Sequence, residues 1–173
     1  MLTKAKATVA DYRKLPEGAK YQLVDGEIIE MPSPSLKHQQ IAMSLARQMG
    51  NIAFEKQNGM ALFAPMDVFL SEENTFQPDL LFVRNEHADR LQRDGVHGPP
   101  DVVIEILSPS TGYYDMKKKF QVYEKFGVQE YFIVDPEDLE VVGYRSSGGR
   151  FHEFLRESGR IASEVLGGEI LFT

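Results

Sequence analysis

The sequence predicts an α/β fold in which a mixed central sheet is flanked by helices, with an N-terminal and a C-terminal hairpin. The first observation is residues 101–134, where an apolar strand, an amphipathic helix and a second apolar strand follow one another. A strand–helix–strand segment makes a right-handed crossover and gives at least one parallel strand pair. The other two observations are the turn sequences Asp25-Gly26 and 146–149, each of which separates two strand-like runs and predicts a hairpin.

The two strands of the crossover are the apolar runs 101–107 and 131–134. Continuous apolar runs are typical of strands that are covered on both faces. The first run carries Glu105, which is therefore a charge in an apolar setting. Residues 113–126 form the helix between the strands. Ser110 or Thr111 can cap this helix, and Gly127 stands where a C-terminal glycine is expected.

Spacing at about 100° per residue gives the helix one broad apolar arc. The arc contains Tyr113, Met116, Phe120, Val122, Tyr123 and Phe126. The opposite side contains Lys117, Lys118, Gln121 and Lys125. Lys119 falls inside the apolar arc, and Asp115 lies near its edge. A lysine on an inward face needs a partner, and Glu105 is the natural candidate. The alternative is that the stem of Lys119 snorkels over the core and its amine reaches water.

Other elements follow from turn residues and periodicity. The expected elements are a short helix over 8–15, hairpin strands at 21–24 and 27–31, a helix over 36–57 that the segment 32–35 can cap, and strands at 62–70 and 76–83. Residues 84–100 are expected to be irregular or helical, 140–145 and 150–155 to form the C-terminal hairpin, and 170–172 to dock as a short strand. His38 falls in the apolar arc of the 36–57 helix, where a packed, hydrogen-bonded histidine is the ordinary interpretation.

Composition places limits on the function. The 173 residues suit one domain, 1–173. A net charge of −7 argues against a dedicated, sequence-independent nucleic-acid binder, which is normally basic. The chain has no cysteine, which excludes disulfides and cysteine-based zinc sites. No run is long and apolar enough to span a membrane, and the N-terminus lacks the apolar core of a signal peptide, so a cytoplasmic location without membrane attachment is expected.

Charged side chains in core-like positions indicate chemistry. Asp79 follows Pro78 at the start of one strand, and Glu105 lies in a strand expected to be its neighbour. Two nearby carboxylates repel each other, and a divalent cation such as Mg²⁺ or Mn²⁺ resolves that repulsion. Such an ion lowers the pKa of a bound water, and Lys119 can orient that water or stabilise developing negative charge. The set suits phosphodiester hydrolysis, with Glu27, His38 and Asp115 as supporting neighbours.

Several segments together resemble a known family. They are 21–27, the Pro-Ser-Pro segment before His38, 77–80, 103–111, Asp115 through Lys119 with Tyr123, and 127–135. This pattern resembles the PD-(D/E)XK nuclease superfamily and, within it, the bacterial Uma-two family of proposed endonucleases. The resemblance implies a restriction-endonuclease-like fold, a Mg²⁺ or Mn²⁺ cofactor and DNA as the partner.

The resemblance also implies roles for particular residues. Asp79 matches the aspartate of the motif and Glu105 its second acid, while the main-chain carbonyl of Ile106 matches a third metal ligand. The superfamily's lysine usually lies two residues after the second acid, but Leu107 occupies that position here. The family resemblance places the lysine on the following helix, at Lys119. Glu27 and His38 match recurrent family positions without a defined role.

Three hypotheses follow. The first is a magnesium-dependent endonuclease that hydrolyses DNA phosphodiester bonds, and a homodimer is an open alternative to a monomer. The second is a catalytically idle domain of the same fold that binds DNA or a protein partner. The third is a structural domain in which Asp79, Glu105 and Lys119 form a buried ion cluster. An enzyme requires a carboxylate pocket open to solvent, whereas a structural cluster requires a closed one.

Overall fold

The computed structural model describes residues 5–16, 18, 20–108 and 113–173, with the side chains of 113–115 left outside the description. Its helices are α1 (Val9–Tyr12), α2 (Leu36–Lys56), the 3₁₀ helix η1 (Asn85–Arg90) and α3 (Tyr113–Phe126). Its strands are β1 (Tyr21–Val24), β2 (Glu27–Glu30), β3 (Gly59–Phe63), β4 (Val68–Ser71), β5 (Asn74–Phe76), β6 (Leu80–Arg84), β7 (Leu91–Gln92), β8 (Gly95–His97), β9 (Val102–Ile106), β10 (Glu130–Val134), β11 (Glu140–Ser147), β12 (Arg150–Ser158), β13 (Arg160–Ser163) and β14 (Gly168–Leu171).

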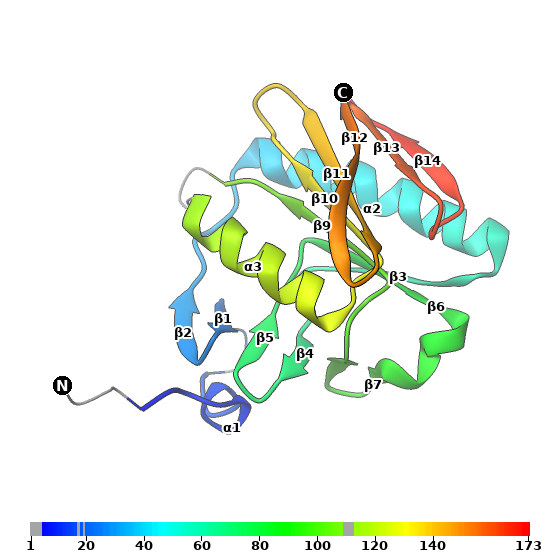
Figure 1. The fold of residues 1–173 in the computed structure, drawn as a ribbon. Helices are drawn as coiled ribbons and strands as arrows, with labels where there is room; N and C mark the ends of the chain where they lie inside the picture. The colour runs from blue at the N-terminus through cyan, green and yellow to red at the C-terminus, as the bar shows by residue number, and fades with distance from the viewer. Residues whose placement is uncertain (1–4, 17, 19, 109–112) are drawn as a thin grey trace.

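The central sheet is mixed, as the sequence predicts. Its strand order is β12-β11-β10-β9-β6-β3, and α3 lies across one face of it while α2 lies on the other (Figure 1). Strands β9 and β10 are parallel, with Val102 opposite Glu130, and the other neighbouring pairs are antiparallel. The crossover β9–α3–β10 and the C-terminal hairpin β11–β12 are therefore confirmed.

A second six-stranded sheet, which the sequence analysis did not predict, has the order β2-β1-β5-β4-β8-β7. The predicted N-terminal hairpin is present and turns at Asp25 (φ 49°) and Gly26 (φ 79°), but it is the edge of this sheet. The prediction of one strand over 62–70 is wrong, because β3 ends at Phe63 and β4 starts at Val68 in the other sheet. Pro65 lies between them and has no N–H to donate to a ladder.

Two further segments differ from expectation. Residues 84–100 contain η1 followed by the short hairpin β7–β8, where an irregular or helical excursion was expected. The terminal strand β14 is present, and it pairs with β13, a strand that the sequence analysis missed. No helix in the described ranges is long and apolar enough to cross a bilayer.

Alternation along the central strands divides the core into two layers. Phe82 and Ile104 pack on the α2 side, whereas Leu81 and Val103 pack on the side of α3 and the second sheet. Successive strand residues point to opposite faces, so Glu105 shares the face of Val103. The period of two therefore directs this carboxylate toward α3.

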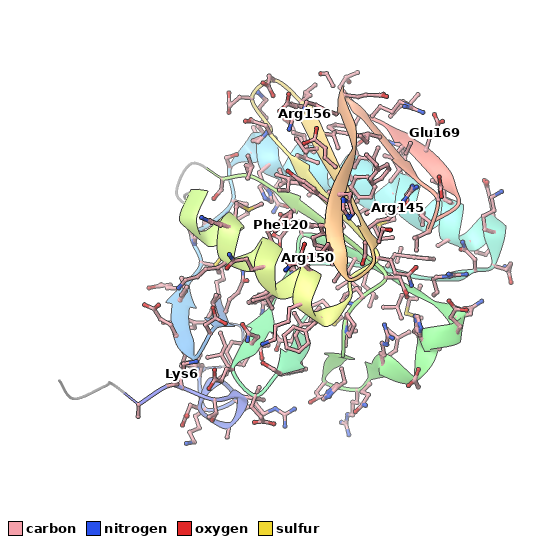
Figure 2. The ribbon with its side chains drawn as sticks, viewed as in Figure 1. Lys6, Phe120, Arg145, Arg150, Arg156 and Glu169 are labelled. Carbon is pink, nitrogen blue, oxygen red and sulfur yellow. The ribbon has the colours of Figure 1, made fainter. Side chains whose placement is uncertain are left out.

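Local signals fix the ends of both long helices. Ser35 caps α2, because its hydroxyl accepts a hydrogen bond from the amide of His38 at 3.1 Å. Gly127 ends α3 in the left-handed conformation (φ 84°), as a C-terminal glycine commonly does. The predicted caps Ser110 and Thr111 lie outside the described residues. Phe120 holds α3 to the β11–β12 hairpin, where its ring lies 4.9 Å from that of Tyr144 (Figure 2).

Candidate active site

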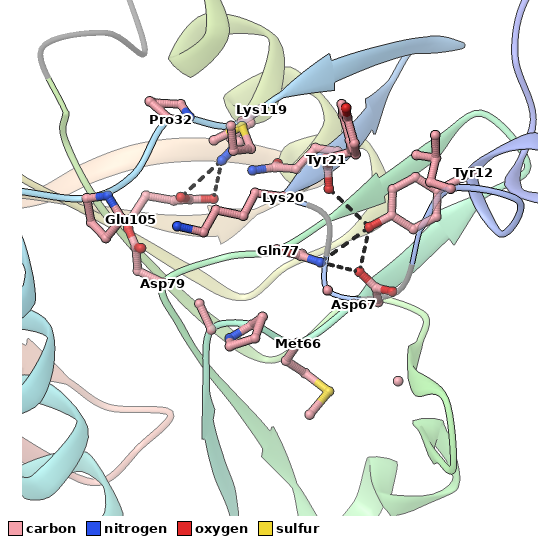
Figure 3. A pocket seen from close by; sticks show the side chains of 18 of the residues that line it. Tyr12, Lys20, Tyr21, Pro32, Met66, Asp67, Gln77, Asp79, Glu105 and Lys119 are labelled. Atoms are coloured by element: carbon pink, nitrogen blue, oxygen red, sulfur yellow. Dashed lines mark hydrogen bonds and ion pairs between the residues drawn. The ribbon is translucent and has the colours of Figure 1, made fainter.

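A cleft of about 760 Å³ lies where residues of both six-stranded sheets, the first turn of α2 and α3 come together. Figure 3 shows part of its lining. Among the residues that line it are His38, Asp79, Glu105, Ile106 and Lys119. The structure therefore brings the predicted carboxylate pair, the predicted lysine and the predicted main-chain ligand to one pocket.

Glu105 and Lys119 form a buried ion pair. The ammonium of Lys119 donates to Oε1 and Oε2 of Glu105 at 3.0 and 3.1 Å, and the two residues are only 2% and 5% exposed, respectively. Burial raises the pKa of Glu105, and the charge of Lys119 opposes that rise. The snorkelling alternative for Lys119 is wrong, since its amine ends inside the protein.

Tyr123 is a third member of this cluster that the sequence analysis did not single out as a site residue. Its hydroxyl donates to Oε1 of Glu105 at 2.8 Å, and its ring packs edge-on against Phe76 with centroids 5.3 Å apart. Burial raises the pKa of this phenol well above its usual value. Tyr123 follows Lys119 by four residues, so the two lie on one helix face, which is the signal that could have identified it.

Asp79 stands just before β6 and is held against the end of β9. Leu80 pairs with Ile104 in the antiparallel β6–β9 ladder, which places Asp79 beside the carboxyl end of β9. Its Oδ2 accepts a hydrogen bond from the main-chain N–H of Ile106 at 2.8 Å. The side chain keeps 19% of its surface exposed, so the carboxylate faces the cleft rather than a closed core.

His38 is a buried partner of Asp79. Its Nε2 lies 3.3 Å from Oδ1 of Asp79, and the residue is 6% exposed. The hydrogen bond to Asp79 raises the pKa of His38 in spite of burial, which acts in the opposite direction. Its Nδ1 is buried and has no hydrogen-bond partner in the described part of the chain.

The structure does not bring every proposed supporting residue to the cleft. Glu27 is exposed on β2 and does not line the pocket. Its carboxylate lies 3.8 Å from Nζ of Lys118, whose side chain is 21% exposed. The fully outward position that the helical pattern predicts for Lys118 is therefore wrong, because most of its side chain is buried and its amine lies near Glu27 of β2. The side chain of Asp115 lies outside the description.

The oxygen donors of the cleft fit a hard divalent cation. Asp79, Glu105 and Ile106 line the same pocket, and no group of three or more acidic or histidine side chains among the described residues forms a metal cluster. Mg²⁺ commonly uses one or two carboxylates with water and substrate oxygens. A carboxylate oxygen has about two lone-pair sites, and among the described residues Oε2 of Glu105 accepts a hydrogen bond from Lys119 alone, so it retains a site for an ion.

A second polar network lies across the cleft from Glu105 (Figure 3). Oδ1 of Asp67 accepts hydrogen bonds from the hydroxyl of Tyr12 and from Nε2 of Gln77, both at 2.8 Å. The same hydroxyl lies 3.0 Å from the carbonyl oxygen of Tyr21, which can share its proton. This network joins α1, β1 and the segments before β4 and β6, and it therefore fixes the wall that faces the carboxylates.

The fold matches that of a solved nuclease-like structure. A crystal structure titled as a putative nuclease of the DUF820 family from Anabaena variabilis superposes with a TM-score of 0.72 at 23% identity, covering 85% of this chain and 83% of that one. The two chains therefore share one mixed α/β fold.

The family follows from the sequence comparison. Residues 9–170 match the Uma2 family, described as "Putative restriction endonuclease", and the chain belongs to this family. A relative with 26% identity over 151 residues, covering 83% of this chain and 82% of its own length, is the uncharacterized protein sll1609 of Synechocystis sp.. The resemblance noted from the motifs is confirmed.

The hydroxyl of Tyr123 is expected to contribute measurably to stability. Tyr123→Phe removes a buried hydrogen bond to Glu105 while keeping the ring, so the free energy of unfolding should fall by about 1–3 kcal/mol. Urea denaturation of the parent, Tyr123→Phe, Glu105→Gln and the double variant measures this. A smaller loss from Tyr123→Phe in the Glu105→Gln background is the expected coupling. Strictly additive losses would contradict a direct interaction.

Proposed function

We propose that this protein is a metal-dependent endonuclease that hydrolyses phosphodiester bonds of DNA. One observation carries the proposal. Asp79, Glu105 and Lys119 line the same cleft, and the carboxylate of Asp79 is open to solvent there. A purely structural ion cluster needs no opening. Membership of a family described as putative restriction endonucleases supports the same class of reaction.

Each residue has a role in this proposal. Asp79, Glu105 and the Ile106 carbonyl would hold Mg²⁺ or Mn²⁺, which would supply Lewis-acid activation and neutralise phosphate charge. The Ile106 N–H and His38 fix the orientation of the Asp79 carboxylate. Lys119, whose ammonium is held by Glu105, stabilises negative charge that develops on the phosphoryl oxygens.

A second candidate is a catalytically idle domain that binds DNA or a protein partner. It is favoured by one observation, which is that both oxygens of Glu105 already accept hydrogen bonds, from Lys119 and Tyr123. In that case the buried pair is a structural unit, and Asp79 is the carboxylate beside it that remains to face a ligand.

Cleavage assays separate the two candidates. Purified protein is expected to cleave at least one of a panel of single-stranded, double-stranded and branched DNA substrates in Mg²⁺ or Mn²⁺, and to lose that activity in chelator, because the metal activates the attacking water. Asp79→Ala serves as the control for contaminating nuclease. Cleavage that persists in chelator with Asp79→Ala would overturn the mechanism, and binding without any cleavage would favour the idle domain.

A further inference from the structure

The shape of the cleft restricts the DNA that it can accept, if the proposed function is correct. Its volume of about 760 Å³ lies within the range of about 300–1,000 Å³ of pockets that enclose a single ligand. Glu105 and Lys119, at 5% and 2% exposure, form its floor. A scissile phosphate must therefore descend into the pocket. In a duplex every such phosphate belongs to a strand whose bases are paired with a second strand, so both strands must approach the pocket together.

The wall of the cleft contains two buried polar atoms that have no hydrogen-bond partner among the described residues. Gln22, on β1, is 1% exposed and lines the cleft, yet its Oε1 is buried without a hydrogen-bond partner among the described residues. Nδ1 of His38, a residue that lines the same cleft, is also buried without a hydrogen-bond partner among the described residues. Buried polar atoms are nearly always paired, and an orphan atom costs free energy. Two orphans on one cleft point to a ligand with hydrogen-bonding edges.

The remainder of the lining contains apolar and basic side chains as well as polar and acidic ones such as Asp94. Methionine and proline side chains contribute much of the apolar part: Met31, Pro32, Pro34, Pro65, Met66 and Met116. Flexible thioethers adapt to flat, irregular ligands. Lys20 and Arg93 also line the cleft, and neither forms an ion pair with a described residue, so both are available in a chain of net charge −7 to attract phosphates.

We propose that the cleft takes one unpaired strand of DNA, such as a single-stranded region or a flap, rather than an intact duplex. A base that is free of its partner can lie against the apolar lining and present its Watson–Crick edge to the amide of Gln22. Lys20 and Arg93 then contact the flanking phosphates. Gln22 is the residue that distinguishes an exposed base edge from one already paired within a duplex.

Equilibrium binding tests this proposal without cleavage. Fluorescence anisotropy is measured in Ca²⁺ with a labelled single strand and with the matching blunt duplex, and the single strand is expected to bind at least about tenfold more tightly. Gln22→Leu is expected to weaken single-strand binding about fivefold. Because it removes an orphan buried acceptor, it should leave Tm unchanged or raise it. The matched control is Gln121→Leu on the exposed face of α3, which should alter neither quantity.

The outcomes separate this inference from the proposed function. Equal or tighter binding of the duplex, or a Gln22→Leu protein that binds single strands as the parent does with its fold intact, would overturn the inference. Metal-dependent cleavage of blunt duplex by that variant at the parental rate would also overturn it and would leave the endonuclease proposal standing. Tight, Gln22-dependent single-strand binding with no cleavage in Mn²⁺ would support the inference and refute the endonuclease.

Discussion

Replacing Lys119 by methionine is expected to reduce DNA cleavage by at least about 100-fold. The amine is the cation placed at the floor of the cleft, and methionine keeps much of the stem that packs there but cannot stabilise negative charge. Lys117→Met is the matched control, since Lys117 is exposed on α3 two positions before Lys119. Single-turnover cleavage rates measure the effect, and equal losses from the two variants would mean that the lysines act only as a phosphate-attracting patch.

Lys119→Met is also expected to destabilise the fold. It leaves Glu105 buried without its counter-charge, which typically costs about 3–5 kcal/mol. Lys119 opposes the burial-driven rise in the pKa of Glu105, so its removal raises that pKa further. A raised carboxyl pKa means that the folded state binds a proton that the unfolded state has released. Stability should therefore be highest below the ordinary carboxyl pKa and fall as pH rises through the folded pKa.

A double variant separates loss of chemistry from loss of fold. Glu105→Gln combined with Lys119→Met removes both charges, so it should recover much of the stability at about pH 8 without recovering cleavage. Chemical denaturation at about pH 5 and about pH 8 gives the stability of each variant. A Lys119→Met protein that is as stable as the parent at both pH values would show that Glu105 does not depend on this pairing.

Asp79→Asn is expected to abolish both cleavage and the response to metal. In the absence of metal, Asp79 and Glu105 are like charges, and the charge of Asp79 contributes to the raised pKa of Glu105. Neutralising Asp79 should therefore raise Tm in chelator. Added metal at 100 times its Kd should stabilise the parent by about 2.7 kcal/mol, which is about 5–10 °C in Tm for a chain of this size. The variant should lose most of that shift, and its cleavage rate should fall at least about 100-fold.

Thermal melts in chelator and in excess Mn²⁺ decide this prediction. Asp67→Asn is the matched control for the metal response, because Asp67 lines the same cleft but is engaged by Tyr12 and Gln77. The increase in Tm that Mn²⁺ gives Asp67→Asn should equal the increase that it gives the parent. If Asp79→Asn instead lowers Tm in chelator and the parent shows no metal response, Asp79 is part of a structural ion cluster and the endonuclease site is refuted.

Local patterns in the sequence determined much of the framework. The period of two along residues 101–107 places Glu105 on one face of β9, and the helical period places Lys119 on the inward face of α3. Their contact follows from these two patterns once the crossover is right-handed. The turn signals at Asp25-Gly26 and Gly127 are equally local, because they depend on backbone conformations that few residues adopt.

The tertiary structure determined which groups surround the Glu105–Lys119 pair. Periodicity tells which face of an element is buried, but not against which partner. The second sheet joins segments far apart in the chain. Pro65 can mark a break within residues 62–70, but nothing in those residues shows which sheet β4 joins. The contact of Tyr123 with Glu105, the approach of His38 to Asp79 and the burial of Gln22 all depend on how these layers meet. Whether distant segments come together depends on the total packing energy of the whole core. No short stretch of the sequence reveals that total.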